Sequence, residues 1–138
     1  MHTTINDLRL FPFTTISGDV KTELMRVFDS NIIPFAVCRI FTVSANADGK
    51  RGEHAHKKCN QLLICVSGAL GLLCDDGEKR HTIQLESDSD GVWIPNGIWA
   101  EQTYLEDRSV LLVFCDQPYE ESDYIRDYNE FLEWKKKQ

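Results

Sequence analysis

The sequence has no long apolar run, and its number of cysteines is odd. No stretch approaches the 18 apolar residues of a membrane-spanning helix, and the first residues show neither the basic start nor the apolar segment of a signal peptide. We therefore expect no membrane anchor and a cytoplasmic protein. The five cysteines are odd in number and never spaced as Cys-x-x-Cys, which argues against a disulfide framework and a zinc knuckle. They are expected to be reduced and mostly buried.

Positively charged residues are also few, and no segment has the composition of a linker. The chain has 15 Lys and Arg against 22 Asp and Glu, a net charge of −7 at pH 7. Nonspecific nucleic-acid binding requires clustered Lys and Arg that neutralise phosphates, so no nucleic-acid partner is expected. The 138 residues contain no low-complexity segment and no Pro/Gly/Ser-rich linker. A single domain over residues 1–138 is predicted.

Short apolar or alternating runs fill the middle of the chain, and turns rich in Gly, Asn and Asp separate them. Many short strands with regular turns favour an antiparallel sandwich or barrel, so the predicted fold class is all-β. Helix is expected only near the ends, over residues 20–28 and 122–137. The predicted strands cover residues 35–43, 61–66, 71–74, 80–85, 92–94 and 110–115.

The two clustered histidines form the strongest motif. Residues two apart on a strand face the same side, so His54 and His56 are predicted to project into one site. The alternative is a pair of partly exposed polar residues on a sheet rim. Their spacing resembles the first motif of the cupin superfamily, in which His-x-His precedes an acidic metal ligand. Gln61 stands where that acidic ligand is expected.

The second cupin motif is also incomplete. Its Pro-x-Gly is present as Pro95-Asn96-Gly97, but the histidine that should follow is replaced by Ala100. A cupin metal site needs about three imidazoles and a carboxylate, and this chain offers two imidazoles and an amide. We therefore predict no metal and no cofactor, and acid–base chemistry by the histidines instead.

Five further residues are candidates for substrate contact. Arg39 lies in a mostly apolar strand, where it requires either an ion-pair partner or an anionic ligand. Arg51 precedes the histidines directly, and Gln61 either faces their cavity or bonds to a neighbouring strand. Trp99 and Tyr104 could stack on a nucleobase, although aromatic residues in strands more often pack.

Four strings, in constant order between about residue 30 and residue 131, are typical of one known family. They are Ile33-Pro34-Phe35, residues 51–58 with both histidines, residues 61–65 and the ending over residues 119–131. On these strings the chain resembles the dTDP-4-keto-6-deoxyglucose 3,4-ketoisomerases, which are related to the dTDP-4-dehydrorhamnose 3,5-epimerases. The resemblance implies a cupin, or double-stranded β-helix jelly roll, with short terminal helices. It also implies a metal-free homodimer with exchanged N-terminal strands.

The resemblance further implies a substrate and roles for individual residues. The substrate is a nucleotide-linked keto sugar, a dTDP-4-keto-6-deoxyhexose, whose carbonyl moves from C4 to C3 on a route to dideoxy-amino sugars of surface polysaccharide such as O-antigen. His56 is the implied base, His54 orients the sugar or shares the proton transfer, and Arg39 and Arg51 meet pyrophosphate or the enolate oxygen. The family's tyrosine on the strand before the histidines is absent here. Two alternatives remain open. One is an epimerase, and the other is a non-catalytic cupin that binds a sugar nucleotide or a biosynthetic enzyme.

Overall fold

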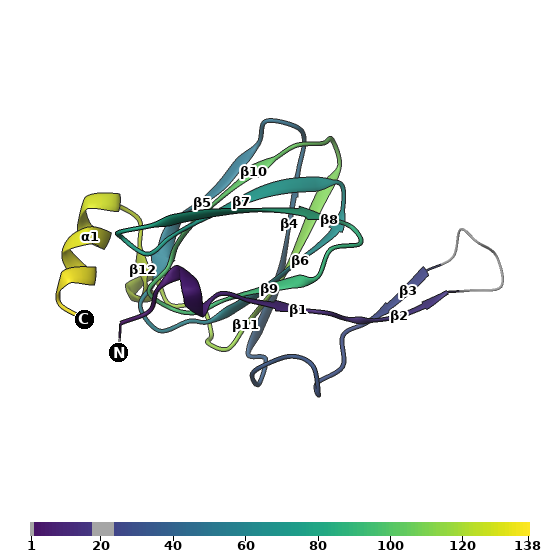
Figure 1. The fold of residues 1–138 in the computed structure, drawn as a ribbon, viewed down its shortest axis with the longest axis horizontal. Helices are drawn as coiled ribbons and strands as arrows, with labels where there is room; N and C mark the ends of the chain where they lie inside the picture. The colour runs from purple at the N-terminus through teal and green to yellow at the C-terminus, as the bar shows by residue number, and fades with distance from the viewer. Residues whose placement is uncertain (1, 18–23) are drawn as a thin grey trace.

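The computed structural model describes residues 2–17 and 24–138 and consists mainly of two facing antiparallel sheets (Figure 1). One sheet has the strand order β1-β9-β6-β11-β4 and the other the order β12-β5-β10-β7-β8. This is the jelly roll of the cupin fold, as predicted. The first sheet contains β1 (Arg9–Phe11), β4 (Arg39–Ala45), β6 (Gln61–Ser67), β9 (Gly91–Ile94) and β11 (Ser109–Cys115); the second contains β5 (Lys50–His56), β7 (Ala69–Asp75), β8 (Arg80–Glu86), β10 (Trp99–Tyr104) and β12 (Tyr124–Ile125).

The main core lies between the two sheets and follows from strand alternation. On β11, Leu111, Val113 and Cys115 face this core, whereas the residues between them face outward. The five cysteines, all in the described part of the chain, are free, and four of them are buried. The prediction of reduced and mostly buried cysteines is confirmed.

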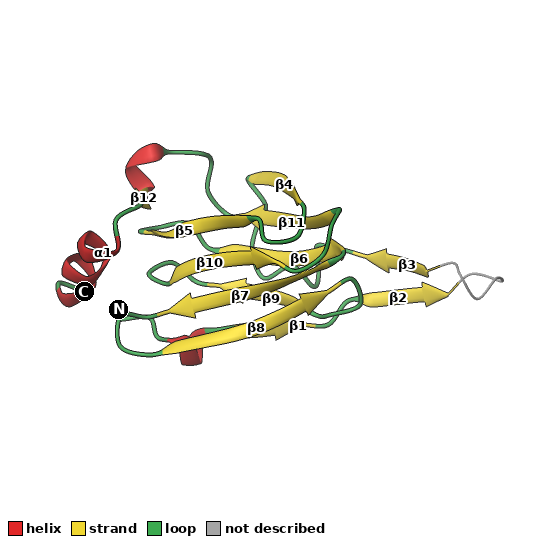
Figure 2. Cartoon of the chain, turned by 90° about the horizontal axis from the view of Figure 1, so that it is seen from above, coloured by secondary structure: helices red, strands yellow, loops and turns green. Residues whose placement is uncertain are grey.

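An N-terminal hairpin projects from the body of the fold (Figures 1 and 2). It pairs β2 (Thr14–Ser17) with β3 (Leu24–Val27). The predicted helix over residues 20–28 is therefore wrong where the chain is described, and residues 20–23 lie outside the described part. Tertiary contacts explain the strand, because the guanidinium of Arg26 donates to three backbone carbonyls elsewhere in the chain. These acceptors belong to Cys65, Ser87 and Ser89.

The C-terminal helix is shorter than predicted. Residues 122–137 were expected to be helical, but α1 spans only Tyr128–Lys136 and begins at the N-cap Asp127, whose side chain accepts a hydrogen bond from the Glu130 amide. Before it, the 3-10 helix η2 (Glu121–Asp123) leads into β12, which pairs with His56 and Ala55 on β5. That pairing takes these residues out of the helix and places them beside the histidines.

The other predicted strands are present in the structure at the expected places, but their first and last residues differ from the prediction. The strand expected over residues 35–43 begins later, at Arg39, and β10 was not predicted. A short 3-10 helix, η1 (Ile5–Asp7), precedes β1. In the described residues, the helices are all too short or too polar to cross a membrane.

Candidate active site

A β-bulge in β5 sets the direction of the two histidines. Ala100 on β10 pairs with His54, and the next residue of β10 pairs with Gly52, so Glu53 is an extra residue on β5. Gly52 has φ +85°, and a Cβ at this position would lie 2.8 Å from the carbonyl oxygen of Ala100. Glycine is therefore required here. Beyond the bulge, Ala55 points outward against α1, and the histidines on either side of it point into the barrel.

The two imidazoles meet edge to face, with ring centroids 4.9 Å apart. Nδ1 of His54 lies 3.1 Å from the carbonyl oxygen of Gly52, and Nδ1 of His56 lies 2.8 Å from Oδ2 of Asp123. Both acceptors can only accept, so each Nδ1 carries the hydrogen and each Nε2 keeps its lone pair. Nε2 of His56 is buried and has no hydrogen-bond partner among the described residues.

Both histidines are held neutral at pH 7. Burial, together with the neighbouring His56, lowers the pKa of His54 to about 4. Burial also lowers the pKa of His56, because it outweighs the opposing effect of Asp123. A neutral imidazole with a free Nε2 can accept a proton, so His56 has the electronic state of a general base.

A cleft of about 420 Å³ opens over these rings. Tyr124 on β12 places its ring 4.4 Å from the His56 ring and 5.0 Å from the His54 ring, measured between centroids. The guanidinium of Arg126 covers Tyr124 at 4.3 Å and is itself held by two hydrogen bonds to Glu121. The cleft is lined by residues of β4, β5 and the C-terminal segment, namely Phe41, Lys50, Arg51, Gly52, Glu53, His54, Tyr119, Tyr124 and Arg126.

Arg39 lies beside the cleft and is paired with a thiol. Its Nη2 lies 3.6 Å from Sγ of Cys115, and the amide of Gln61 donates to the same sulfur at 3.5 Å. Burial lowers the pKa of Arg39, but the hydrogen bond to Cys115 and the charge interactions with Cys115 and Tyr124 outweigh it, and the pKa is raised. The pKa of Cys115 is lowered, first by the hydrogen bond from Cys59, then by those from Gln61 and Arg39. Nε of Arg39 is buried without a partner in the described chain, and it remains available to a ligand.

The structure brings together five of the seven predicted site residues. His54 and Arg51 line the cleft, His56 lies beneath Tyr124, and Arg39 and Gln61 meet at Cys115.

The other two predicted residues do not reach the cleft, which corrects the expectation that they contact substrate. Trp99 is 4% exposed, packs against Tyr128 and Phe131 of α1, and donates from Nε1 to Glu101. Tyr104 is fully buried in the main core. In both cases strand alternation directs the aromatic ring into a packed layer rather than into the cleft.

Sequence reasoning missed Asp123, Tyr124 and Arg126 as site residues. All three belong to the C-terminal string that carried the family resemblance, so a signal was present. They were assigned to a terminal helix, and nothing in their local pattern shows that this segment adds a strand to β5.

The donor set does not fit a cupin metal centre. Of the four ligand positions of the two motifs, two hold His54 and His56, one holds Ala100, and the amide of Gln61 is engaged with Cys115. A different trio, His56, Cys59 and Asp123, has potential ligand atoms within 4.8 Å of one another. Its carboxylate already accepts from Nδ1 of His56 and from the Lys58 amide, and the pKa of the Cys59 thiol is raised by its hydrogen bond to Cys115 and by burial. These groups act as a hydrogen-bond network.

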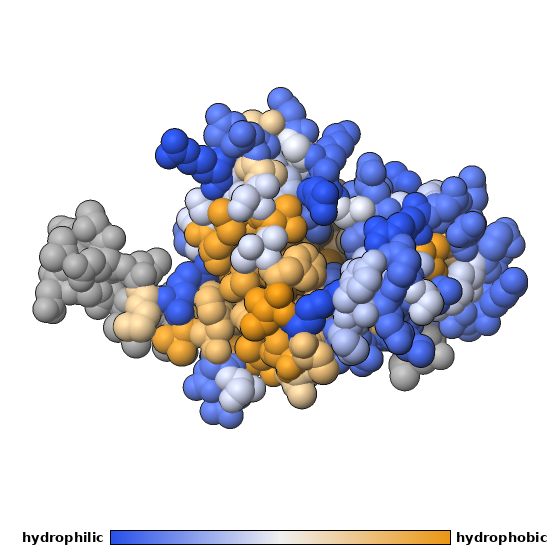
Figure 3. All heavy atoms as spheres, turned by 180° about the vertical axis from the view of Figure 1, so that it is seen from behind, coloured by the Kyte–Doolittle hydropathy of each residue, from blue (hydrophilic) through white to orange (hydrophobic). Residues whose placement is uncertain are grey.

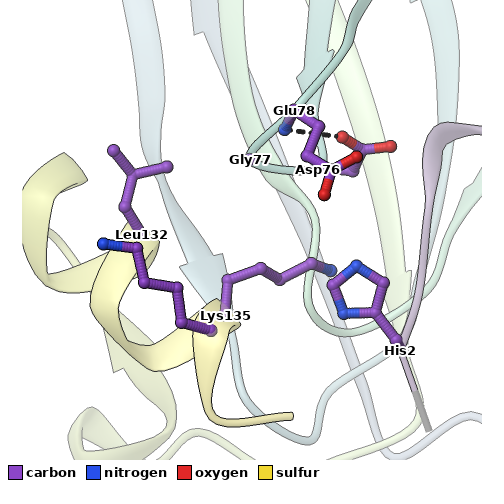
Figure 4. Close-up of a pocket in the computed structure, with 7 residues that line it drawn as sticks. His2, Asp76, Gly77, Glu78, Leu132 and Lys135 are labelled. Carbon is purple, nitrogen blue, oxygen red and sulfur yellow. Dashed lines mark hydrogen bonds between the residues drawn. The ribbon is translucent and has the colours of Figure 1, made fainter.

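A second hollow, of about 260 Å³, lies between the N-terminal segment, the β7–β8 turn and α1 (Figure 4). Its buried amine, Nζ of Lys135, donates to the carbonyl oxygens of Thr3 and Gly97. Asp76 accepts from the amides of Ile5 and Glu78. These contacts join the two ends of the chain, and the hollow is a structural junction.

Known proteins with the same fold and length resemble this chain. Residues 1–136 match the protein family described as "FdtA: WxcM-like, C-terminal". The TDP-4-oxo-6-deoxy-alpha-D-glucose-3,4-oxoisomerase of Aneurinibacillus thermoaerophilus is 31% identical over 117 residues, which cover 84% of each chain. The sugar 3,4-ketoisomerase QdtA of Thermoanaerobacterium thermosaccharolyticum, solved with TDP, is 30% identical with a TM-score of 0.88 and covers 97% of this chain and 98% of its own.

A histidine-to-asparagine variant of QdtA, solved with TDP-4-keto-6-deoxyglucose, has a TM-score of 0.89 at 28% identity, with 98% of each chain covered. The fold and these relatives define the class of protein as cupin-fold isomerases. The chain belongs to the FdtA family, the group to which the sequence resemblance pointed.

Proposed function

We propose that this protein is a metal-independent sugar-nucleotide isomerase that moves the keto group of a dTDP-4-keto-6-deoxyhexose between C4 and C3. The observation that carries the proposal is the His56–Asp123 pair. The carboxylate fixes the hydrogen on Nδ1, which leaves Nε2 buried, unprotonated and without a hydrogen-bond partner among residues 2–17 and 24–138, next to the cleft. The relatives named for 3,4-ketoisomerase activity and their complexes with TDP and a TDP-keto sugar support the same substrate class.

The chemistry is a proton abstraction next to a carbonyl. Nε2 of His56 takes the proton from C3, the C–H electron pair forms a C3=C4 bond, and the former carbonyl electrons move onto the C4 oxygen. The C3 hydroxyl then passes its proton to the C4 oxygen and becomes the new carbonyl, while the C3=C4 electron pair takes up a proton at C4. Asp123 stabilises the imidazolium that forms on His56. His54 accepts a hydrogen bond from the sugar at its free Nε2.

Two arginines meet the negative charge of the substrate. Arg51 lines the cleft, and Arg39 holds a buried Nε that has no hydrogen-bond partner in the part of the chain that the structure describes. The protein carries a net charge of −7, so a diphosphate must be met by such local cations. We assign Arg51 to the pyrophosphate and Arg39 to the enolate oxygen, where a preorganised donor lowers the barrier most.

We further propose a cytoplasmic homodimer, acting as one domain in dideoxy-amino sugar biosynthesis for surface polysaccharide. The outer face of the first sheet supports the dimer, because Ile40 and Val66 are exposed there beside buried Ile64 and Phe114. Figure 3 shows apolar residues gathered on one face next to the projecting hairpin. A two-stranded hairpin is marginally stable alone, so β2 and β3 are the strands suited to pairing with a second copy.

Proton NMR in deuterated buffer tests the proposed reaction. The EDTA-treated protein is mixed with freshly made dTDP-4-keto-6-deoxyglucose, beside His56→Ala and the control His81→Ala, which alters an exposed histidine on β8. We expect a 3-keto product with deuterium at C4 from the wild type and the control, and none from His56→Ala. Nucleotide binding without product or C3 exchange would favour a non-catalytic cupin, and exchange without keto migration would favour an epimerase.

A further inference from the structure

The keto migration needs a proton at C4 as well as a base at C3, and the groups assigned so far account only for the base. His56 starts the reaction with its Nε2 unprotonated. The remaining question is which group of the cleft holds a proton that it can deliver to carbon.

His54 does not meet this requirement. Its Nδ1 hydrogen is engaged by the carbonyl oxygen of Gly52, and its Nε2 bears no hydrogen. Burial lowers its pKa to about 4, so the doubly protonated ring is scarce at pH 7. His54 therefore accepts hydrogen bonds in the cleft and does not donate a proton to the substrate.

Tyr124 meets the requirement by position. Its ring lines the cleft and contacts both imidazoles, at centroid distances of 4.4 and 5.0 Å. It reaches this place through backbone pairing, because Tyr124 is the register partner of His56 across β12 and β5. A group fixed by a strand pair next to the catalytic base is held with the precision that proton transfer needs.

The surroundings of Tyr124 suit a phenol that gives up its proton. The hydroxyl of Tyr124 can donate its hydrogen to a substrate in the cleft that its ring lines. Arg126 lies over the ring at 4.3 Å, locked in place by Glu121. This fixed cation stabilises the negative charge that the phenol acquires.

We infer that Tyr124 is a catalytic residue that delivers the proton to C4, on the assumption that the proposed isomerase function holds. His56 takes the C3 proton and the enediolate forms. The C3 oxygen then releases its proton and forms the new carbonyl, and the C3=C4 electron pair takes the proton of the Tyr124 hydroxyl. The proton released from the C3 oxygen neutralises the C4 oxygen. Transfer from the His56 imidazolium to the Tyr124 phenolate through solvent restores both groups.

The test separates the two proton transfers with Tyr124→Phe, which keeps the ring against both histidines and removes only the oxygen. Tyr128→Phe is the matched control, because its hydroxyl binds Asp75 beside α1, away from the cleft. The same NMR sample reports both steps. The C3 proton signal disappears as deuterium replaces that proton, and the signals of the 3-keto product appear as it forms. We expect Tyr124→Phe to exchange at C3 within about threefold of the wild-type rate and to form product at least roughly 100-fold more slowly.

Two results would overturn the assignment. Product formation by Tyr124→Phe at a rate within a few-fold of wild type would show that His56 itself returns the proton to C4. Loss of C3 exchange together with product, in a variant with an unchanged circular dichroism spectrum, would show that Tyr124 only positions His56. Absence of both signals from the wild-type enzyme is a different outcome, because it refutes the proposed isomerase function.

Discussion

Asp123 holds His56 with one carboxylate oxygen at 2.8 Å and accepts the backbone amide of Lys58 with the other at 2.6 Å. The carboxylate thus has a fixed orientation, and the tautomer of His56 is set by the segment that precedes β12. The base and the residue that orients it come from parts of the chain 67 positions apart.

Asp123→Asn is expected to lower kcat by roughly 100-fold or more, because an amide nitrogen facing Nδ1 would favour the tautomer with hydrogen on Nε2. The asparagine oxygen can still accept from Lys58, so the fold should persist. Steady-state kinetics and thermal unfolding of the same preparations check this. Asp127→Asn is the control, since asparagine caps a helix as well as aspartate does. Activity of Asp123→Asn within a few-fold of wild type would argue against the orienting role.

Stability should fall on acidification because His54 is held neutral. The pKa of His54 is about 4 in the folded protein and 6.5 in the unfolded chain, so between these values the unfolded chain binds more protons. The stabilisation is complete above pH 6.5 and is lost as the pH falls toward 4, by up to about 3 kcal/mol. Urea unfolding at pH 7.5 and 5 should show a smaller loss for His54→Gln than for wild type. The exposed His81→Gln should behave like wild type, and equal losses for all three proteins would refute this account.

The sequence predicts those features that neighbouring residues determine, and it does not predict those that depend on contacts between distant segments. The alternation of β6 and β11 and the His54–His56 pair follow from period two, and both were predicted. The orientation of Trp99 could not be predicted, because the docking of α1 on the outer side of β10 is a contact between distant segments. Tyr124 was misassigned to a helix, since its pairing with β5 is a contact between distant segments.

Gly52→Ala should destabilise the protein and reduce activity together. The methyl group would meet the carbonyl oxygen of Ala100 at 2.8 Å, and the positive φ is unfavourable for alanine. We expect a loss of about 1–3 kcal/mol in the free energy of unfolding. Gly71→Ala on β7 is the matched control, because its nearest neighbouring atom, the Thr103 carbonyl oxygen, would lie 4.0 Å from the new methyl group. Chemical denaturation of both variants measures the difference, and equal stabilities would show that the bulge tolerates a side chain.

The proposed dimer predicts that one charge on the outer face of the first sheet separates the subunits. Ile40 is 57% exposed on β4 and projects from the side opposite Arg39 and the core. Burying this apolar face against a second copy is favourable by about 25 cal/mol per Å² of apolar surface, and a glutamate there would have to be desolvated. Ile40→Glu should therefore elute as a monomer in size-exclusion chromatography with light scattering, whereas Gln84→Glu, an exposed position on β8 of the opposite sheet, should remain a dimer. If wild type and both variants share one mass, this face is not the interface. If the Ile40→Glu monomer also loses its activity while its circular dichroism spectrum is unchanged, the second copy is needed to complete the active site.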